Sequence, residues 1–178
     1  MSNPNFNMKR RNLVVMFLLM FFFPFPYLIW WSCSVQNQFR QKTGMGFGGV
    51  GHFFMMIITF GIYQIYWHFA VGKRITAAGG PKRSSRYGWL YLLGLALTWG
   101  LMIGGMAMII SPFMDVIDTL MNADPIPEAE EIVEMFMDVF RDAMGGVVMI
   151  FIGSTISSVF MYLVPMLIQN DVNRVPQV

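Results

Sequence analysis

Residues 88–114 read GWLYLLGLALTWGLMIGGMAMIISPFM, a run of 27 residues without a charge. A helix needs about 20 apolar residues to cross the hydrocarbon core of a bilayer. The whole chain is 56% hydrophobic and only 12% charged, whereas a soluble domain carries about 25% charged residues. A soluble fold of 178 residues could not bury so much apolar surface, and we therefore expect an integral membrane protein.

Three further stretches have the length and composition of membrane spans: residues 12–31, 50–72 and 144–168. Inside lipid every backbone amide must be bonded within its own segment, which favours helices. The sequence thus predicts an all-α polytopic fold with about four transmembrane helices, in a single membrane domain over residues 1–178. Pro24 and Pro26 should kink the first span. No small-residue cleavage site follows the first apolar run, so we expect it to be retained.

The charges are divided between two parts of the chain. Residues 1–110 contain ten Lys or Arg and no Asp or Glu, and nine of the ten acidic residues lie between Asp115 and Asp142. With four crossings, nine basic residues would face the side of the two termini, and three would face the other side. These three are Arg40, Lys42 and Arg141. Because basic residues collect on the cytoplasmic side, we expect both termini in the cytoplasm and the acidic loop outside.

The first half of the chain repeats with an offset of 36 residues. The segment from Met16, MFLLMFFFPFPYLIWWSCSVQNQFRQKTG, aligns without a gap on the segment from His52, HFFMMIITFGIYQIYWHFAVGKRITAAGG. We assign residues 12–44 to the first repeat unit and residues 48–80 to the second. A shorter echo relates VQNQFR, after the first span, to IQNDVNR at residues 168–174. Matched aromatic residues near the span ends are the expected anchors at the membrane interface, namely Tyr27, Trp31, Tyr63 and Trp67.

The second repeat unit carries a recognisable motif, ITFGIYQIYWHFAVGKRI at residues 58–75. It resembles the signature of a bacterial membrane-protein family of unknown function (domain of unknown function four-two-three-four). In that family a T-x-G-I-Y-x-x-Y-W core ends a span, and Thr59, Gly61, Ile62, Tyr66 and Trp67 match it together with Tyr63. The first copy departs from the pattern, with PFP in place of T-x-G, and the acidic insertion is foreign to it. The resemblance implies a multi-pass protein of the bacterial inner (plasma) membrane and no particular reaction.

Small residues spaced by four recur in the last two predicted spans. Ala96, Gly100 and Gly104 follow this spacing in the third span, and Gly153 and Ser157 follow it in the fourth. Small side chains let helix backbones approach closely in lipid. We expect these residues to pack helices, either within the chain or against a partner helix.

The acidic insertion, residues 115–143, should contain one amphipathic helix outside the membrane. Asp124 is the expected N-cap with Pro125 at the first helical position, and the glycine pair at residues 145–146 should end the helix. Its apolar face is the expected partner-docking surface, formed by Ile132, Phe136, Val139 and Phe140. The alternative is a connector that packs on its own bundle.

The sequence predicts no catalytic, metal-binding or cofactor-binding site. His52 and His68 lie about 24 Å apart along one predicted helix, so they cannot share a metal ion. The segment GMGFGGVG, residues 44–51, lacks the strand and the lysine of a nucleotide-binding loop and is expected to be a hinge. The predicted spans also lack paired carboxylates and nucleophile–base sets, so we expect a protein that is not an enzyme.

Two hypotheses for function remain. The first is a non-enzymatic accessory or scaffold subunit of a larger membrane protein complex. The alternative is a small oligomeric channel or transporter, with a water-filled path lined by residues such as Gln64 and His68. Expected partners are other membrane proteins and, at the basic loop GGPKRSSR of residues 79–86, anionic lipid head groups. Nucleic acid is not an expected partner.

Overall fold

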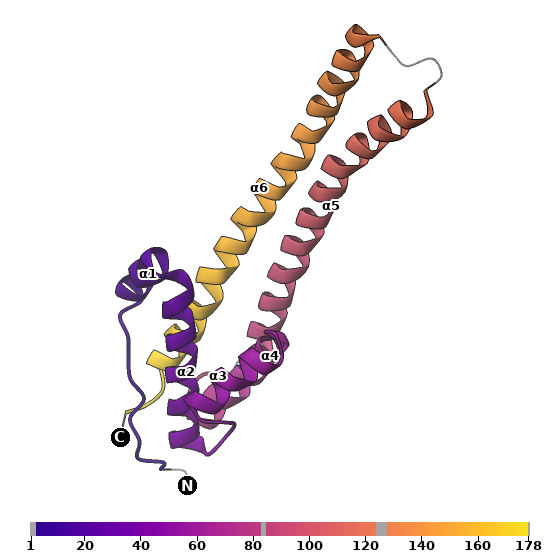
Figure 1. Ribbon diagram of the computed structural model, residues 1–178. Helices are drawn as coiled ribbons and strands as arrows, with labels where there is room; N and C mark the ends of the chain where they lie inside the picture. Colours follow the sequence, from indigo (N-terminus) through magenta and orange to yellow (C-terminus); the bar gives the residue numbers. More distant parts are fainter. Residues whose placement is uncertain (1–2, 83–84, 124–127, 178) are drawn as a thin grey trace. The chain divides into compact units, whose positions relative to one another are not determined.

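The computed structural model describes residues 3–82, 85–123 and 128–177. Within these ranges the chain forms six α-helices and no strand (Figure 1). The helices are α1 (Leu13–Phe22), α2 (Pro24–Thr43), α3 (Gly49–Ile58), α4 (Ile62–Ala77), α5 (Arg86–Asn122) and α6 (Ala129–Asn173). The predicted all-α fold is therefore confirmed for the described part of the chain. Contacts divide the chain into a first unit, Met1–Leu93 with Phe160–Val178, and a second unit, Gly94–Val159.

Helix length separates α5 and α6 from the other helices. Among the described residues, only these two helices are long and apolar enough to cross a membrane. With 37 and 45 residues, they extend about 55 and about 67 Å, against about 30 Å for a hydrocarbon core. The apolar helices α1 and α3 have ten residues each, which is about 15 Å. The prediction of four crossings is therefore not confirmed, because each of the first two predicted spans is divided into two helices.

The two divided spans are broken at equivalent places. Both ends of α3 follow those of α1 by 36 residues, which is the offset of the sequence repeat. The first break is at Phe23, and Pro24 begins α2. Proline has no backbone N–H with which to continue the preceding helix. The prolines thus separate two helices, whereas the sequence predicted a kink in one.

The second break uses the Thr-x-Gly part of the motif in the second repeat unit. Phe60 and Gly61 both have positive φ angles, 48° and 86°, and glycine adopts this left-handed region without strain. Thr59 Oγ1 donates to Met55 O at 2.7 Å and accepts from the Tyr63 N–H at 3.0 Å. The threonine hydroxyl therefore bonds to the end of α3 and to the start of α4, so that one residue supports both sides of the break.

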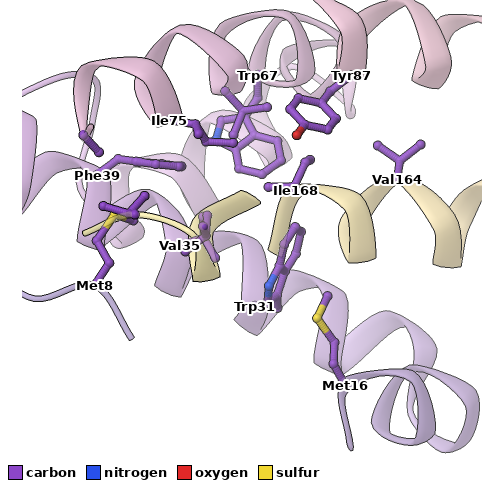
Figure 2. Packing of buried hydrophobic residues seen from close by; sticks show 14 of the residues in the cluster. Met8, Met16, Trp31, Val35, Phe39, Trp67, Ile75, Tyr87, Val164 and Ile168 are labelled. Atoms are coloured by element: carbon purple, nitrogen blue, oxygen red, sulfur yellow. The ribbon is translucent and has the colours of Figure 1, made fainter. Parts of the chain in front are cut away.

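Most of the core of the first unit comes from three helical segments, α2, α4 and the C-terminal part of α6, and α1 adds the buried Met16 and Met20. Val35 and Phe39 from α2, Ile75 from α4, and Ile168 and Val172 from α6 have no exposed surface. Figure 2 shows Val35, Phe39, Ile75 and Ile168 within one cluster of buried side chains. The related segments VQNQFR and IQNDVNR thus contribute apolar residues at matching positions to the same core.

The N-terminal segment packs beside the end of α2. The backbone N–H of Asn3 donates to Gln41 O at 2.7 Å, and Lys42 Nζ donates to Phe6 O at 3.0 Å. Residues that precede and follow the first predicted span therefore lie together. This placement is incompatible with one straight crossing between them.

In the second unit, α5 and α6 approach each other at a pair of glycines. A Cβ atom on Gly105 would lie only 2.6 Å from Gly146 O, so a residue with a side chain would push the helices apart. α6 continues through residues 145–146 to Asn173, because this close packing outweighs the low helix propensity of glycine. The described acidic residues therefore extend α5 and α6 and do not form a separate helix. Asp124 and Pro125 lie outside the described residues.

Candidate functional site

A buried polar network surrounds Gln36 in the first unit. Its Oε1 accepts from Trp67 Nε1 at 3.0 Å and from the Arg74 guanidinium, and its Nε2 donates to Phe47 O at 2.6 Å. Gln36 is fully buried, and Arg74 is 5% exposed. Among the described residues, Arg74 has no carboxylate partner. One glutamine side chain therefore forms hydrogen bonds with a buried indole, with a buried guanidinium and with a backbone carbonyl in the turn before α3.

A second network of the same kind surrounds Gln169. Its Oε1 accepts from Trp31 Nε1 at 2.9 Å and from Arg11 Nη1 at 3.0 Å, and its Nε2 donates to Asn173 Oδ1 at 2.8 Å. Asn173 Nδ2 donates in turn to Arg11 O at 2.7 Å. Gln36 and Gln169 occupy the same position in VQNQFR and IQNDVNR. The echo in the sequence therefore corresponds to two glutamines that each hold a buried tryptophan and an arginine.

The tryptophans expected at the membrane interface lie inside the first unit. Trp31 and Trp67 are almost completely buried, and their rings meet edge to face with centroids 6.1 Å apart. Tyr63 is also buried, and Tyr27 is half-buried. Their chain neighbours Trp30 and Tyr66 are instead exposed, at 53% and 60%. These two also match at the 36-residue offset, but the sequence does not show which of two adjacent aromatic residues faces the core.

The two histidines, one in α3 and one in α4, both contact the Trp67 ring, with centroid distances of 5.2 Å for His52 and 5.0 Å for His68. The expectation that they lie about 24 Å apart along one helix is therefore wrong, because the chain turns back between the two helices. The ring centroid of His52 lies 5.3 Å from that of Tyr63, and His68 stacks on Tyr91 at 3.9 Å. His68 Nδ1 lies 2.7 Å from Gln64 O, within hydrogen-bond distance. The described residues contain no group of three or more His, Cys, Asp or Glu side chains that could hold a metal ion.

The expected helix-packing residues divide between two faces of the second unit. An added Cβ on Gly104 or Gly153 would lie 3.2 or 3.1 Å from a side-chain atom of the other helix, so both residues are at the contact between α5 and α6. Ser157 is half-buried. Ala96 and Gly100 are exposed, and nothing lies within 4 Å of a Cβ on Gly100. Part of the small-residue pattern thus faces away from the chain's own helix pair.

Two apolar stripes run along the acidic part of α6. The inner stripe includes the buried Val139 and Ala143 and the half-buried Ile132. The outer stripe is exposed, follows the i, i+3, i+4, i+7 spacing of one helix face, and consists of Val133, Phe136, Met137 and Phe140. Of the predicted docking residues, Phe136 and Phe140 are therefore available to a partner, whereas Val139 is 3% exposed. Acidic residues accompany the outer stripe, namely Glu130, Glu134 and Asp138, and Asp138 forms an ion pair with Arg141 at 2.8 Å.

Burial affects two ionisable groups near the start of the chain. Burial raises the pKa of the Cys33 thiol, and a hydrogen bond with Ser32 opposes this shift. Burial also lowers the pKa of the Arg11 guanidinium, while the nearby Tyr27 opposes that shift. A raised pKa lowers the thiolate fraction of Cys33 at neutral pH and so disfavours reaction as a nucleophile.

No family model, curated protein or solved structure matches this chain. What is established is therefore the architecture: the described residues form α-helices only, and two of these, α5 and α6, are long and apolar enough to cross a membrane.

Proposed function

We propose that the protein is a non-enzymatic scaffold subunit of a bacterial inner-membrane complex and crosses the bilayer twice, through α5 and α6. The charge-free residues 88–114 and 144–168 lie within these helices, and each exceeds the roughly 20 residues that one crossing needs. Only 17% and 11% of their most apolar windows are buried within the chain. Lipid or other membrane proteins must therefore cover the remaining surface.

In this proposal the pairs α1–α2 and α3–α4 are two helical hairpins that enter one leaflet and return. The turns at their tips are apolar, with Phe23 59% and Phe60 97% exposed. Turns in contact with water are usually built from Gly, Pro, Asn, Asp and Ser. Exposed phenylalanines at both tips favour a place in lipid, about 15 Å deep for a ten-residue helix.

Backbone hydrogen bonding at the second tip supports the same placement. The N–H groups of residues 59–62 all donate to backbone carbonyl groups, at 2.9–3.2 Å. The next N–H, that of Tyr63, donates to Thr59 Oγ1. The hydrocarbon offers no water to unpaired backbone groups, and the N–H groups of this break already have partners within the protein.

Two crossings also divide the basic residues between the two sides of the membrane more unequally than four crossings do. Arg40 and Lys42 join the side of the N-terminal segment, so eleven of the twelve basic residues lie on one side and only Arg141 on the other. The positive-inside rule then puts both termini in the cytoplasm. Residues 79–86, the basic loop, would face the anionic head groups of the cytoplasmic leaflet.

The observation that carries the scaffold role is the outer stripe of α6. The bilayer needs only residues 144–168, so residues 129–143 extend about 20 Å beyond it. Four large apolar side chains are exposed there between acidic residues. Exposed apolar surface outside lipid marks a protein-binding site, and the acidic flanks suit a partner with basic groups around an apolar groove.

The test is co-purification of partner proteins from native membranes in a mild detergent. The double variant Phe136→Ser/Phe140→Ser should lose partners that the unchanged protein retains. The control is Ile117→Ser/Met121→Ser, which removes two exposed apolar side chains from the acidic end of α5 and should retain them. Both variants should stay in the membrane fraction. Full retention by the first variant, or equal loss by both, would contradict docking at the outer stripe.

The alternative is a small oligomeric channel or transporter, which needs polar side chains along a water-filled path. Gln64 Nε2 donates to Met56 Sδ, and His68 is buried against Tyr91. Both side chains are therefore engaged in contacts within the protein and do not line an open path between the described residues. A purified protein that has no partners but forms a discrete homo-oligomer would favour this alternative.

A further inference from the structure

A groove with a volume of about 610 Å³ opens between α2 and α3 in the first unit. One face of α2, from Trp30 to Arg40, forms one wall, and residues 48–51 with Phe53 form the other. The glycines of the second wall allow the two helices to approach closely. An added Cβ on Gly49 would lie 2.6 Å from Cys33 O, so α3 rests directly on the backbone of α2 beside the groove.

The groove is polar at one end and apolar at the other. At the polar end, Arg40 Nη1 lies 3.3 Å and Asn37 Oδ1 3.6 Å from the Cβ position of Gly48. At the apolar end, Trp30 and Phe53 line the wall. Ten residues of α2 separate Trp30 from Arg40, which is about 15 Å along the helix. The groove is therefore long enough to hold a charged group at one end and a hydrocarbon chain at the other.

The charge around the groove is positive. Arg40 lines it, and Arg11 lies at its edge, where Nη2 donates to Ser34 Oγ at 2.7 Å and the guanidinium sits 5.5 Å from the Trp30 ring centroid. Among the described residues neither arginine has a carboxylate partner, and none of those lining the groove is acidic. The first amides of α3 add partial positive charge to these two cations, because Gly48 supplies no side-chain cap.

We propose that this groove binds one anionic phospholipid, with its phosphate at Arg40 and an acyl chain along Trp30 and Phe53. Charge complementarity selects the anionic head group, and the apolar wall selects a lipid over a soluble phosphate, which would leave that wall uncovered. The groove is distinct from the basic loop of residues 79–86. The proposal is independent of the scaffold role, because it needs only the contact between α2 and α3.

Native mass spectrometry of the full-length protein tests the proposal, with dioleoyl phosphatidylglycerol and dioleoyl phosphatidylcholine as probes in mixed detergent micelles. The unchanged protein should retain one phosphatidylglycerol in preference to phosphatidylcholine. Arg40→Ala should weaken phosphatidylglycerol binding by about five- to tenfold, and Arg40→Lys should restore most of it. The matched control Arg141→Ala, at an exposed arginine of the second unit, should leave binding unchanged.

A second variant tests the groove without changing charge. Val50 lines the groove and is 73% exposed, so Val50→Trp should fill the groove, exclude the lipid and leave the fold intact. Excess soluble glycerol phosphate should not displace the lipid. The proposal would be overturned if the protein bound both lipids equally, or if glycerol phosphate displaced the lipid. It would also be overturned if Arg40→Ala or Val50→Trp bound phosphatidylglycerol as well as the unchanged protein does, or if Arg141→Ala lost binding.

Discussion

Replacement of Gln36 by leucine should destabilise the first unit far more than the loss of one hydrogen bond. Leucine has a similar size but no polar atoms. Gln36→Leu therefore leaves two buried groups without their partner, the Trp67 indole N–H and the Arg74 guanidinium, and also removes the donor to the Phe47 carbonyl. Trp67 has no exposed surface and Arg74 is 5% exposed, so water cannot replace the bonds to these two groups without a local opening.

The magnitude follows from these three groups. A buried neutral group without a partner costs about 1–3 kcal/mol, and a buried charged group costs more. Burial of the leucine side chain returns about 1.5–3 kcal/mol. We expect a net loss of about 3 kcal/mol in the free energy of unfolding, since the losses share one site and are not fully additive.

The assay is unfolding of the purified protein from mild detergent by titration with sodium dodecyl sulfate, followed by tryptophan fluorescence. The matched control is Gln64→Leu, because Gln64 is half-buried and its side chain donates only to Met56 Sδ, a weak acceptor. The control should cost less than about 1 kcal/mol. If Gln36→Leu costs no more than Gln64→Leu, the network around Gln36 does not stabilise the fold and the reasoning fails.

Two further predictions concern the packing in the second unit and the single cysteine. Gly146→Leu should separate α5 from α6 and expose the helix pair to limited proteolysis, because there is no room for a side chain between Gly146 and Gly105. The control Gly100→Leu should be digested like the unchanged protein. Equal digestion of both variants would contradict the close contact at Gly105 and Gly146. Cys33 should react with a maleimide at pH 7 more slowly than an exposed cysteine from Lys82→Cys in a Cys33→Ser background, because partial burial raises the pKa of the Cys33 thiol and lowers its thiolate fraction. A rate equal to that of the exposed cysteine at pH 7 would contradict the raised pKa of the Cys33 thiol.

The sequence predicts the helical class and the two long apolar helices, because continuous hydropathy is sufficient evidence for them. It does not reveal the breaks at Phe23 and Phe60, since both lie inside apolar runs and depend on one or two backbone angles. Pro24 and the Thr-x-Gly spacing were the available signals, and each was compatible with a kink in a continuous helix. Their role becomes clear only when the hydroxyl of Thr59 is seen to bond to both helices.

The side-chain contacts were harder to predict for a related reason. Gly104 fits the four-residue spacing and faces α6, but the closest approach is at its neighbour Gly105. Similarly, Trp31 and Trp67 match aromatic-belt positions, but their indoles bond to glutamines that are distant in sequence. The spacing of apolar residues in the sequence identifies the buried face of a helix only to within about one residue. Long-range hydrogen bonds and packing then determine which of two neighbouring residues is buried.

The proposed arrangement of α1–α4 as two hairpins on the cytoplasmic side is tested most directly by labelling of introduced cysteines with a membrane-impermeant thiol reagent. In a Cys33→Ser background, Glu130→Cys should be labelled from outside intact cells, because it lies in the exposed acidic part of α6. Lys42→Cys should be labelled only after the membrane is permeabilised, since residue 42 lies beside the N-terminal segment. Labelling of Lys42→Cys from outside intact cells would restore the four-crossing topology and contradict the two-crossing account.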